Sequence, residues 1–157
     1  MQRRSTTRTL AVVGGLVATL VSPLMAQLKA PDDVKTALRL LVQVSNDFKR
    51  QITNKNFTRV PHEFMEYTEA ADALRMSTKD EPAAFKNRVD MRLKAAVTAY
   101  QKVSDMSGKE TDPAKLLGEH AKAVTAMNAL FDLCPAEMRP DPNLPPPETD
   151  RRARSSR

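Results

Sequence analysis

The stretch that decides the fold is Pro113–Cys134, PAKLLGEHAKAVTAMNALFDLC. Its apolar side chains recur at steps of three and four residues, which is the period of one helical face. They are Leu116, Leu117, Ala123, Val124, Met127, Leu130, Phe131 and Cys134. His120 lies in the middle of this face as its one imidazole. Because a helix with a single apolar face needs partners to cover it, the stretch predicts a helical core.

Three earlier segments have the same periodicity, so the sequence predicts helices over 32–53, 61–76, 81–107 and 113–134. Gly108 is expected to end the third helix in a left-handed conformation. Asp112 and Pro113 are expected to begin the fourth, and Pro135 to end it. Since the loops are short, consecutive helices should be antiparallel neighbours. We expect an all-α, up-down-up-down four-helix bundle over 27–134.

Residues 1–26 are typical of an export signal. Three arginines precede an apolar run over 10–21, and Leu24-Met25-Ala26 offers a small-residue exit. We expect cleavage after Ala26, with an uncleaved anchor as the alternative. The run is shorter than the roughly 20 residues of a membrane span, so the mature protein is expected to be periplasmic or secreted and not an integral membrane protein.

Charge and composition argue against nucleic-acid binding. The formal net charge is +6, but three of these charges are the leader arginines. The remainder is well mixed and forms no basic stripe, and the chain has no Trp for base stacking. Residues 135–157 are rich in Pro and Arg and are expected to form a disordered tail, which could tether the domain to an acidic surface. The single cysteine, Cys134, is either a small buried hydrophobe or a thiol open to a partner.

Two polar residues of the predicted core should meet. The third and fourth helices join at their 107 and 113 ends, so Tyr100 and His120 are expected at the same height, both pointing inward. They are either the polar wall of a ligand pocket or a structural hydrogen bond inside an apolar bundle.

His62 is expected near the height of His120, since the second and fourth helices run in the same direction. The two histidines could hold a metal with Glu66 or Met65, although His62 falls opposite the apolar side of its helix. Glu63, Glu66 and Glu69 also follow one another at three-residue steps. We interpret this acidic series as a solvated face, because the Glu-x-x-His pairs of a di-iron bundle are missing.

The stretch 122–139, KAVTAMNALFDLCPAEMR, resembles the end of the last helix in the cytochrome c′ family of exported four-helix bundles. Members of that family attach haem there through C-x-x-C-H, followed by an aromatic residue and an arginine. Cys134 and Arg139 stand in about those places, whereas the second cysteine and the axial histidine are missing. The resemblance therefore implies a bundle of the same architecture without the cofactor.

These observations predict an exported, soluble helical bundle that is not an enzyme and that binds a protein or small-molecule partner. We expect His120, Tyr100 and His62 to bind the ligand, and we expect no catalytic residue, metal or cofactor. The alternative is a periplasmic metal- or haem-binding bundle, for electron transfer or metal handling, that uses the histidines and methionines. A homodimer through the first two helices is also open, because Met65 and Met76 could form an apolar strip outside the core.

Overall fold

The computed structural model describes residues 31–140, and side chains from Val34 onward. The predicted leader and residues 141–157 lie outside this range. Within it the chain is all-helical, without strands. The elements are α1 (Pro31–Thr53), a 3₁₀ turn η1 (Phe57–Arg59), α2 (Val60–Ser77), α3 (Ala83–Ser107), α4 (Pro113–Phe131) and a second 3₁₀ turn η2 (Ala136–Met138).

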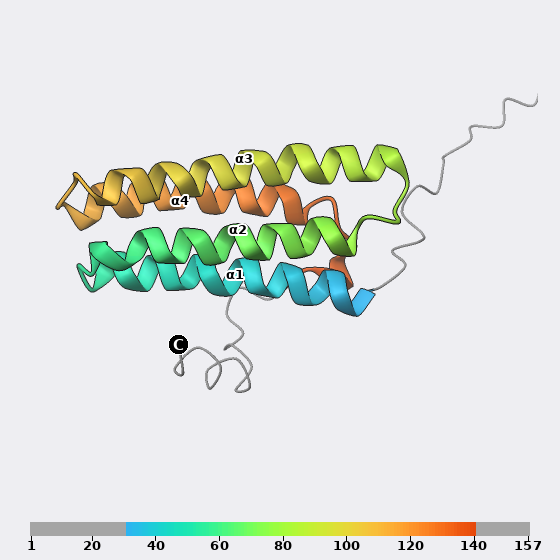
Figure 1. Cartoon of the computed structure of the whole chain (residues 1–157), viewed down its shortest axis with the longest axis horizontal. Helices are drawn as coiled ribbons and strands as arrows, with labels where there is room; N and C mark the ends of the chain where they lie inside the picture. Colours follow the sequence, from blue (N-terminus) through green and yellow to red (C-terminus); the bar gives the residue numbers. More distant parts are fainter. Residues whose placement is uncertain (1–30, 141–157) are drawn as a thin grey trace, which may run out of the picture.

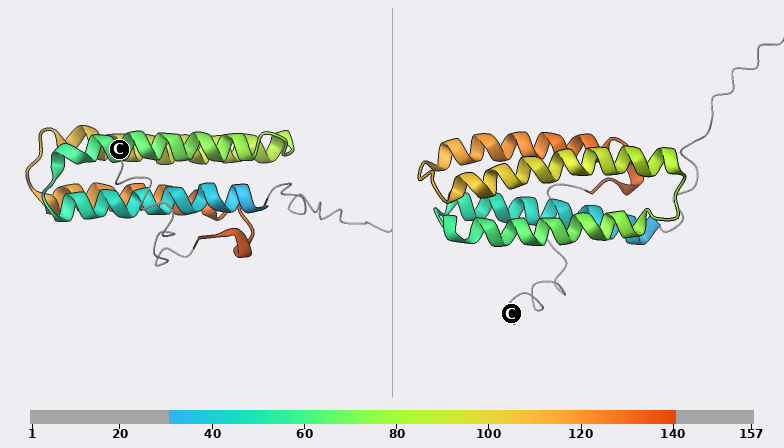
Figure 2. Two further views of the ribbon diagram at one scale, coloured as in Figure 1. Left: turned by 60° about the horizontal axis from the view of Figure 1, so that its bottom comes forward. Right: turned by 45° about the horizontal axis from the view of Figure 1, so that its top comes forward.

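The four α-helices lie side by side as a bundle (Figures 1 and 2). The closely packed pairs are α1 with α2, α2 with α3, α3 with α4, and α4 with α1. Each helix turns its apolar face inward, and the largest fully buried side chains include Phe48, Tyr67, Leu93, Tyr100 and Leu130. Burial of this apolar surface is the main stabilising contribution, because no disulfide is possible in a chain with one cysteine.

The predicted helices are all present, and their ends differ by at most three residues. The third begins at Ala83 because Pro82 before it has an extended backbone, with ψ of 139°. The fourth ends at Phe131, three residues earlier than expected, and 132–134 form a turn. Cys134 precedes Pro135, and a residue before proline is disfavoured in helical conformation. At the start of α4, Oδ1 of Asp112 accepts a hydrogen bond from the Ala114 amide at 2.9 Å, as the predicted cap should.

The prediction that Gly108 ends the third helix in a left-handed conformation is wrong. Gly108 has φ of −77°, an ordinary right-handed value, and so ends α3 without the special conformation that glycine permits. The one residue with positive φ among those described is Lys55, at 57°, in the turn after α1. Lys55 lies between Asn54 and Asn56, residues that are common in turns.

The chain remains folded beyond the expected end of the domain at residue 134. Met138 is buried, and the η2 turn that carries it packs on α1. Nε of Arg139 donates to the carbonyl oxygen of Cys134 at 3.0 Å, which ties the segment to the end of α4. Residues 135–140, predicted as the start of the tail, thus have defined structure because Met138 supplies an apolar anchor.

Within residues 31–140, no helix combines the length and the apolar character that crossing a membrane requires.

Candidate functional site

A groove of about 450 Å3 lies between α1 and α4 and is a candidate for a binding site. Both helices and the segment after η2 contribute to its walls. The lining residues are Val42, Ser45, Asn46, Lys49, Leu117, His120, Ala121, Val124, Met127, Asn128, Phe131 and Pro140. A volume in this range is typical of small-molecule sites, which are mostly apolar with a few polar groups.

His120 is one of two buried polar residues of the groove, with only 5 % of its surface exposed, and the other is Ser45. Its ring nitrogen Nε2 lies 2.9 Å from the carbonyl oxygen of Ser45 and 3.3 Å from the Ser45 hydroxyl. A carbonyl oxygen can only accept, so Nε2 carries the proton in this contact. The neutral imidazole then has its lone pair on Nδ1.

The environment keeps this imidazole neutral. Burial lowers the pKa of His120 below its ordinary value, and the nearby charge of Lys49 lowers it further, whereas the hydrogen bond to Ser45 acts in the opposite direction. Burial is the largest of these effects. At neutral pH the groove therefore presents a polar but uncharged ring.

Nδ1 of His120 forms no hydrogen bond with any described residue. The fully buried side-chain atoms without a hydrogen-bond partner among the described residues include the Tyr67 hydroxyl but not this nitrogen. The side chain that carries this nitrogen lines the groove. A lone pair on a neutral ring can accept a hydrogen bond or ligate a metal.

Tyr100 lies behind His120 and not in the groove wall. The two rings meet edge to face with centroids 5.8 Å apart, so the predicted neighbourhood is confirmed. Their polar atoms are joined through a third residue, because the Tyr100 hydroxyl donates to Oγ of Ser45 at 2.5 Å. Burial also raises the pKa of Tyr100, which keeps the hydroxyl protonated. Tyr100 therefore positions Ser45 and, through it, His120.

Sequence reasoning gave no role to Ser45, which the structure buries on the apolar face of α1. A serine at a core position of an otherwise apolar face was the available signal, because a buried hydroxyl needs a partner. The partner could not be named, since the lateral arrangement of the helices was not known from the sequence.

His62 does not join this site. It is exposed at the start of α2, where its Nε2 lies 3.3 Å from Oε1 of Glu66. The groups of at least three metal-ligating side chains among the described residues include neither histidine. The structure thus brings Tyr100 and His120 together and leaves His62 on another surface.

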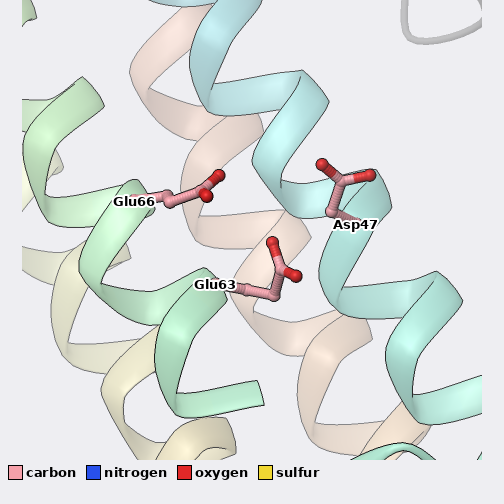
Figure 3. Close-up of side chains that lie close together, drawn as sticks. All are labelled: Asp47, Glu63 and Glu66. Atoms are coloured by element: carbon pink, nitrogen blue, oxygen red, sulfur yellow. The ribbon is translucent and has the colours of Figure 1, made fainter. Parts of the chain in front are cut away.

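That surface carries a carboxylate cluster formed by Asp47 on α1 with Glu63 and Glu66 on α2 (Figure 3). One oxygen of each carboxylate lies within 4.8 Å of the others. Glu63 is only 4 % exposed and accepts a hydrogen bond from Nε2 of Gln51 at 3.0 Å. The expectation of a solvated acidic face is therefore wrong for Glu63, although Glu69 is exposed.

Burial raises the pKa of Glu63, and the charges of Asp47 and Glu66 add to this effect, against the Gln51 hydrogen bond and His62. Arg50 pairs with Asp47 at 2.8 Å and His62 lies against Glu66. Basic and amide groups thus already surround the cluster. These three carboxylates are the described residues that could hold a hard cation, since such ions prefer oxygen ligands. The sequence signal for Glu63 was its place one turn before Tyr67, on the buried side of α2.

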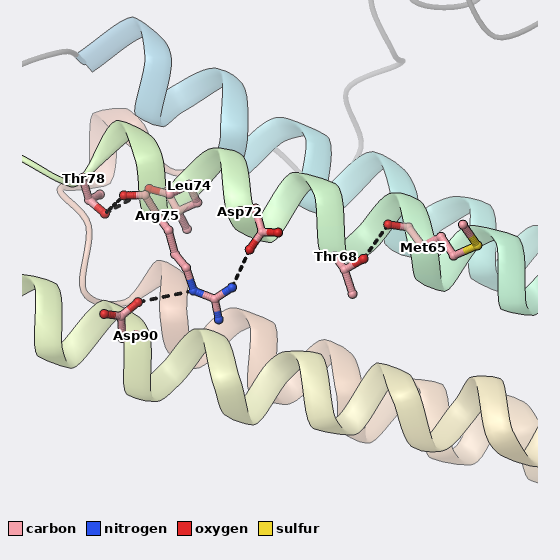
Figure 4. A network of polar contacts seen from close by, with 7 residues as sticks. All are labelled: Met65, Thr68, Asp72, Leu74, Arg75, Thr78 and Asp90. Atoms are coloured by element: carbon pink, nitrogen blue, oxygen red, sulfur yellow. Dashed lines mark hydrogen bonds and ion pairs between the residues drawn. The ribbon is translucent and has the colours of Figure 1, made fainter.

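The outer faces of α2 and α3 expose Met65, Met76 and Met91, each more than 60 % accessible. Polar contacts run along α2 and from α2 to α3 (Figure 4). Arg75 bonds to Asp72 at 2.6 Å and lies 3.5 Å from Asp90 on α3. Met65 and Met76 lie outside the core as predicted, but the surface around them carries charged side chains and is not a continuous apolar strip.

Cys134 is 4 % exposed, and burial raises its pKa, so it is the small buried hydrophobe that was one of the two expectations. It does not line the groove.

Comparison of the chain with protein-family models, with curated proteins and with solved structures finds no match.

Proposed function

We propose that this protein is an exported, soluble helical bundle that binds a small molecule in the groove between α1 and α4. The observation that carries the proposal is a neutral, almost fully buried histidine that lines an otherwise mostly apolar groove. Sites of this kind bind by apolar contact and use a few fixed polar groups for orientation.

The sequence supports the cellular setting of this proposal. The basic start, short apolar run and small-residue exit of residues 1–26 favour secretion and cleavage after Ala26. The periplasm, or the exterior of the cell, is then the place where the ligand is met. The short connections between consecutive helices favour the antiparallel up-down-up-down order that sets α1 beside α4.

Binding is favoured over catalysis by the bonding of the groove's polar groups. The Ser45 hydroxyl is held by Tyr100, and Nε2 of His120 is engaged by the Ser45 carbonyl. Among the described residues that line the groove there is no carboxylate and no thiol to pair with the imidazole. The nucleophile, base and orienting group of a hydrolytic site are therefore not assembled there.

A fluorescent apolar probe tests this function. The full chain is titrated with N-phenyl-1-naphthylamine, which brightens in an apolar site. We expect saturable binding that is lost in Ala121→Trp, because the new ring fills the groove, and kept in Ala95→Trp, which adds the same ring to the exposed side of α3. No saturable signal, or equal signals in both variants, would contradict a binding role for the groove.

A second candidate function is haem or metal binding through His120. The imidazole of His120 in the groove wall, with its proton held on Nε2 by the Ser45 carbonyl, favours it, since imidazole is a ligand of haem iron and copper. The position of Cys134 outside the groove favours non-covalent over covalent haem. Adding haem to the full chain should then produce a Soret band that His120→Gln abolishes. Unchanged haem spectra would exclude haem on His120.

A further inference from the structure

The groove is elongated along the seam between α1 and α4. Its lining residues on α4 run along one face of the helix from Leu117 to Phe131, which corresponds to about 21 Å of helix. The volume of about 450 Å3 is therefore spread over nearly four turns. A compact ring would occupy only part of this length, whereas a long, flexible ligand can follow it.

The contact between Ser45 and His120 divides the groove into two ends. Nε2 lies 2.9 Å from the carbonyl oxygen, so the two residues stand at the same height in the bundle. With α1 and α4 antiparallel, as proposed above, Lys49 lies on one side of this contact together with Leu117, and Val42 lies on the other side (Figure 1). The two ends therefore differ in chemistry.

One end carries the ammonium of Lys49. Lys49 is exposed and follows Ser45 by one helical turn, about 6 Å along α1. It forms no ion pair within residues 34–140, and its charge acts on the imidazole of His120. No described acidic residue lines the groove. An anionic head group is therefore complementary to this end.

The other end is apolar. Val42 on α1 and Met127 and Phe131 on α4 are buried, and Val124 lies between them and the Ser45–His120 contact. A hydrocarbon chain laid against these side chains removes apolar surface from water on both partners. The thioether of Met127 also adapts readily to an irregular apolar partner.

The polar contact between the two ends does not block such a chain. The Ser45 hydroxyl is held by Tyr100, and Nε2 of His120 is held by the Ser45 carbonyl. A hydrocarbon chain can therefore pass along the groove without breaking either hydrogen bond.

Resting on the proposed binding function, we infer that the groove binds a free fatty acid with an unbranched chain of about twelve carbons. The carboxylate lies beside Lys49, the chain passes the Ser45–His120 contact, and its end lies near Val42 and Met127. With carbon–carbon bonds of about 1.5 Å, an extended chain of twelve carbons reaches about 14 Å. Val42 lies about 10 Å from Lys49 along α1, so the chain spans both ends.

Calorimetric titration of the full chain at low salt tests the inference with octanoate, decanoate and dodecanoate below their micelle-forming concentrations. Each added pair of CH2 groups should tighten binding about threefold to tenfold, because it buries more apolar surface. Decyltrimethylammonium has the tail length of decanoate and the opposite charge. It should bind about fivefold more weakly than decanoate, and the difference should shrink with added salt.

A charge reversal assigns the head group to its residue. Lys49→Glu, on the surface of α1, should reverse the preference, so that decyltrimethylammonium binds more tightly than decanoate. Lys94→Glu makes the same change at an exposed lysine of α3 outside the groove, and it should leave the preference for decanoate intact.

A blocked far end assigns the tail. Asn128 is an exposed lining residue about 16 Å from Leu117 along α4, and Asn128→Trp places a large ring there. Octanoate reaches only about 9 Å and should bind as before, whereas the advantage of dodecanoate over octanoate should fall below about threefold. Asn87→Trp, at an exposed position of α3 outside the groove, should preserve the full advantage.

The inference is overturned if chain length does not affect affinity, or if decyltrimethylammonium binds the unaltered chain as tightly as decanoate. It is also overturned if Lys49→Glu keeps the preference for decanoate, or if Asn128→Trp behaves like Asn87→Trp. These outcomes leave the proposed function standing, as long as the apolar probe binds and is excluded by Ala121→Trp. If neither the probe nor any of the carboxylates binds, the function and the inference both fail.

Discussion

Nε2 of His120, on α4, lies 2.9 Å from the carbonyl oxygen of Ser45, on α1. The hydroxyl of the same serine accepts a hydrogen bond from Tyr100, on α3. One small residue therefore links three helices through polar contacts in the interior of an otherwise apolar bundle. It fixes the ring proton of His120 on Nε2, and so leaves Nδ1 as the acceptor of the neutral ring.

Replacing Ser45 with alanine should destabilise the protein by about 2 kcal/mol, because the buried Tyr100 hydroxyl loses its main partner. Urea unfolding of the full chain measures the change. Thr125→Ala is the control: Thr125 is exposed and bonds only within its own helix, so its loss should cost less than about 0.5 kcal/mol. In a double-mutant cycle with Tyr100→Phe, the two losses should not add. Additive losses would show that the contact contributes little.

The pH dependence of stability should report the buried imidazole. The pKa of His120 is lowered in the folded state, so the unfolded chain binds a proton at a higher pH than the folded chain. The contribution of His120 is therefore complete above about pH 6.5 and is lost as the pH falls through the folded-state value. Wild-type protein should lose stability relative to His120→Gln between pH 7.5 and 5.

A direct titration tests the same point without unfolding. The imidazole signal of His120 in NMR spectra should titrate with a pKa below its ordinary value, and His120→Gln assigns the signal. A midpoint at or above about 6.5 would contradict the proposed neutral state of the ring at physiological pH.

Helical periodicity was enough to predict the helices and their buried faces, because it can be recognised within one helix at a time. It identified the buried face with His120, and short loops then placed Tyr100 at the same height. The periodicity gave no information on which residue of a neighbouring helix would lie opposite. Ser45 and the groove with Lys49 depend on the lateral packing of α1 against α4, which side-chain shapes decide collectively.

The acidic series shows the same limit. Glu63 was grouped with Glu66 and Glu69 by residue type, although it precedes Tyr67 by one turn on the buried side. Its burial also depends on Gln51 and Asp47 of α1, and their height relative to α2 follows from the turn around Lys55. A charged residue at a buried position could be anticipated, but its partner could not.

Glu63→Gln should stabilise the protein at pH 7 by up to about 1 kcal/mol, because it removes a buried charge while an amide can still accept from Gln51. The pKa of Glu63 is raised in the folded state, so its ionised form is the costly one. Its contribution is favourable below the unfolded pKa near 4.5 and is lost as the pH rises through the folded value. The advantage of the variant should therefore shrink as the pH falls toward 4.

Glu69→Gln is the matched control for this prediction, since Glu69 belongs to the same series and is exposed. It should change the unfolding free energy by less than about 0.5 kcal/mol at either pH. Destabilisation by Glu63→Gln at pH 7 would mean that the ionised carboxylate is stabilised by its surroundings, as it would be with a bound cation. Repeating the measurement with calcium and with a chelator separates these two cases.

The thiol of Cys134 should report how firmly the segment after α4 is docked. Burial raises the pKa of Cys134, and only the thiolate attacks a disulfide reagent, so the native chain should react slowly with Ellman's reagent and at once in denaturant. Met138→Ala removes the apolar anchor of the segment that Arg139 ties to the Cys134 carbonyl, and we expect the reaction to become at least about tenfold faster. Met65→Ala, which shortens an exposed methionine on α2, should leave the rate unchanged. Equal rates in the two variants would mean that the core of the bundle, and not this segment, covers the thiol.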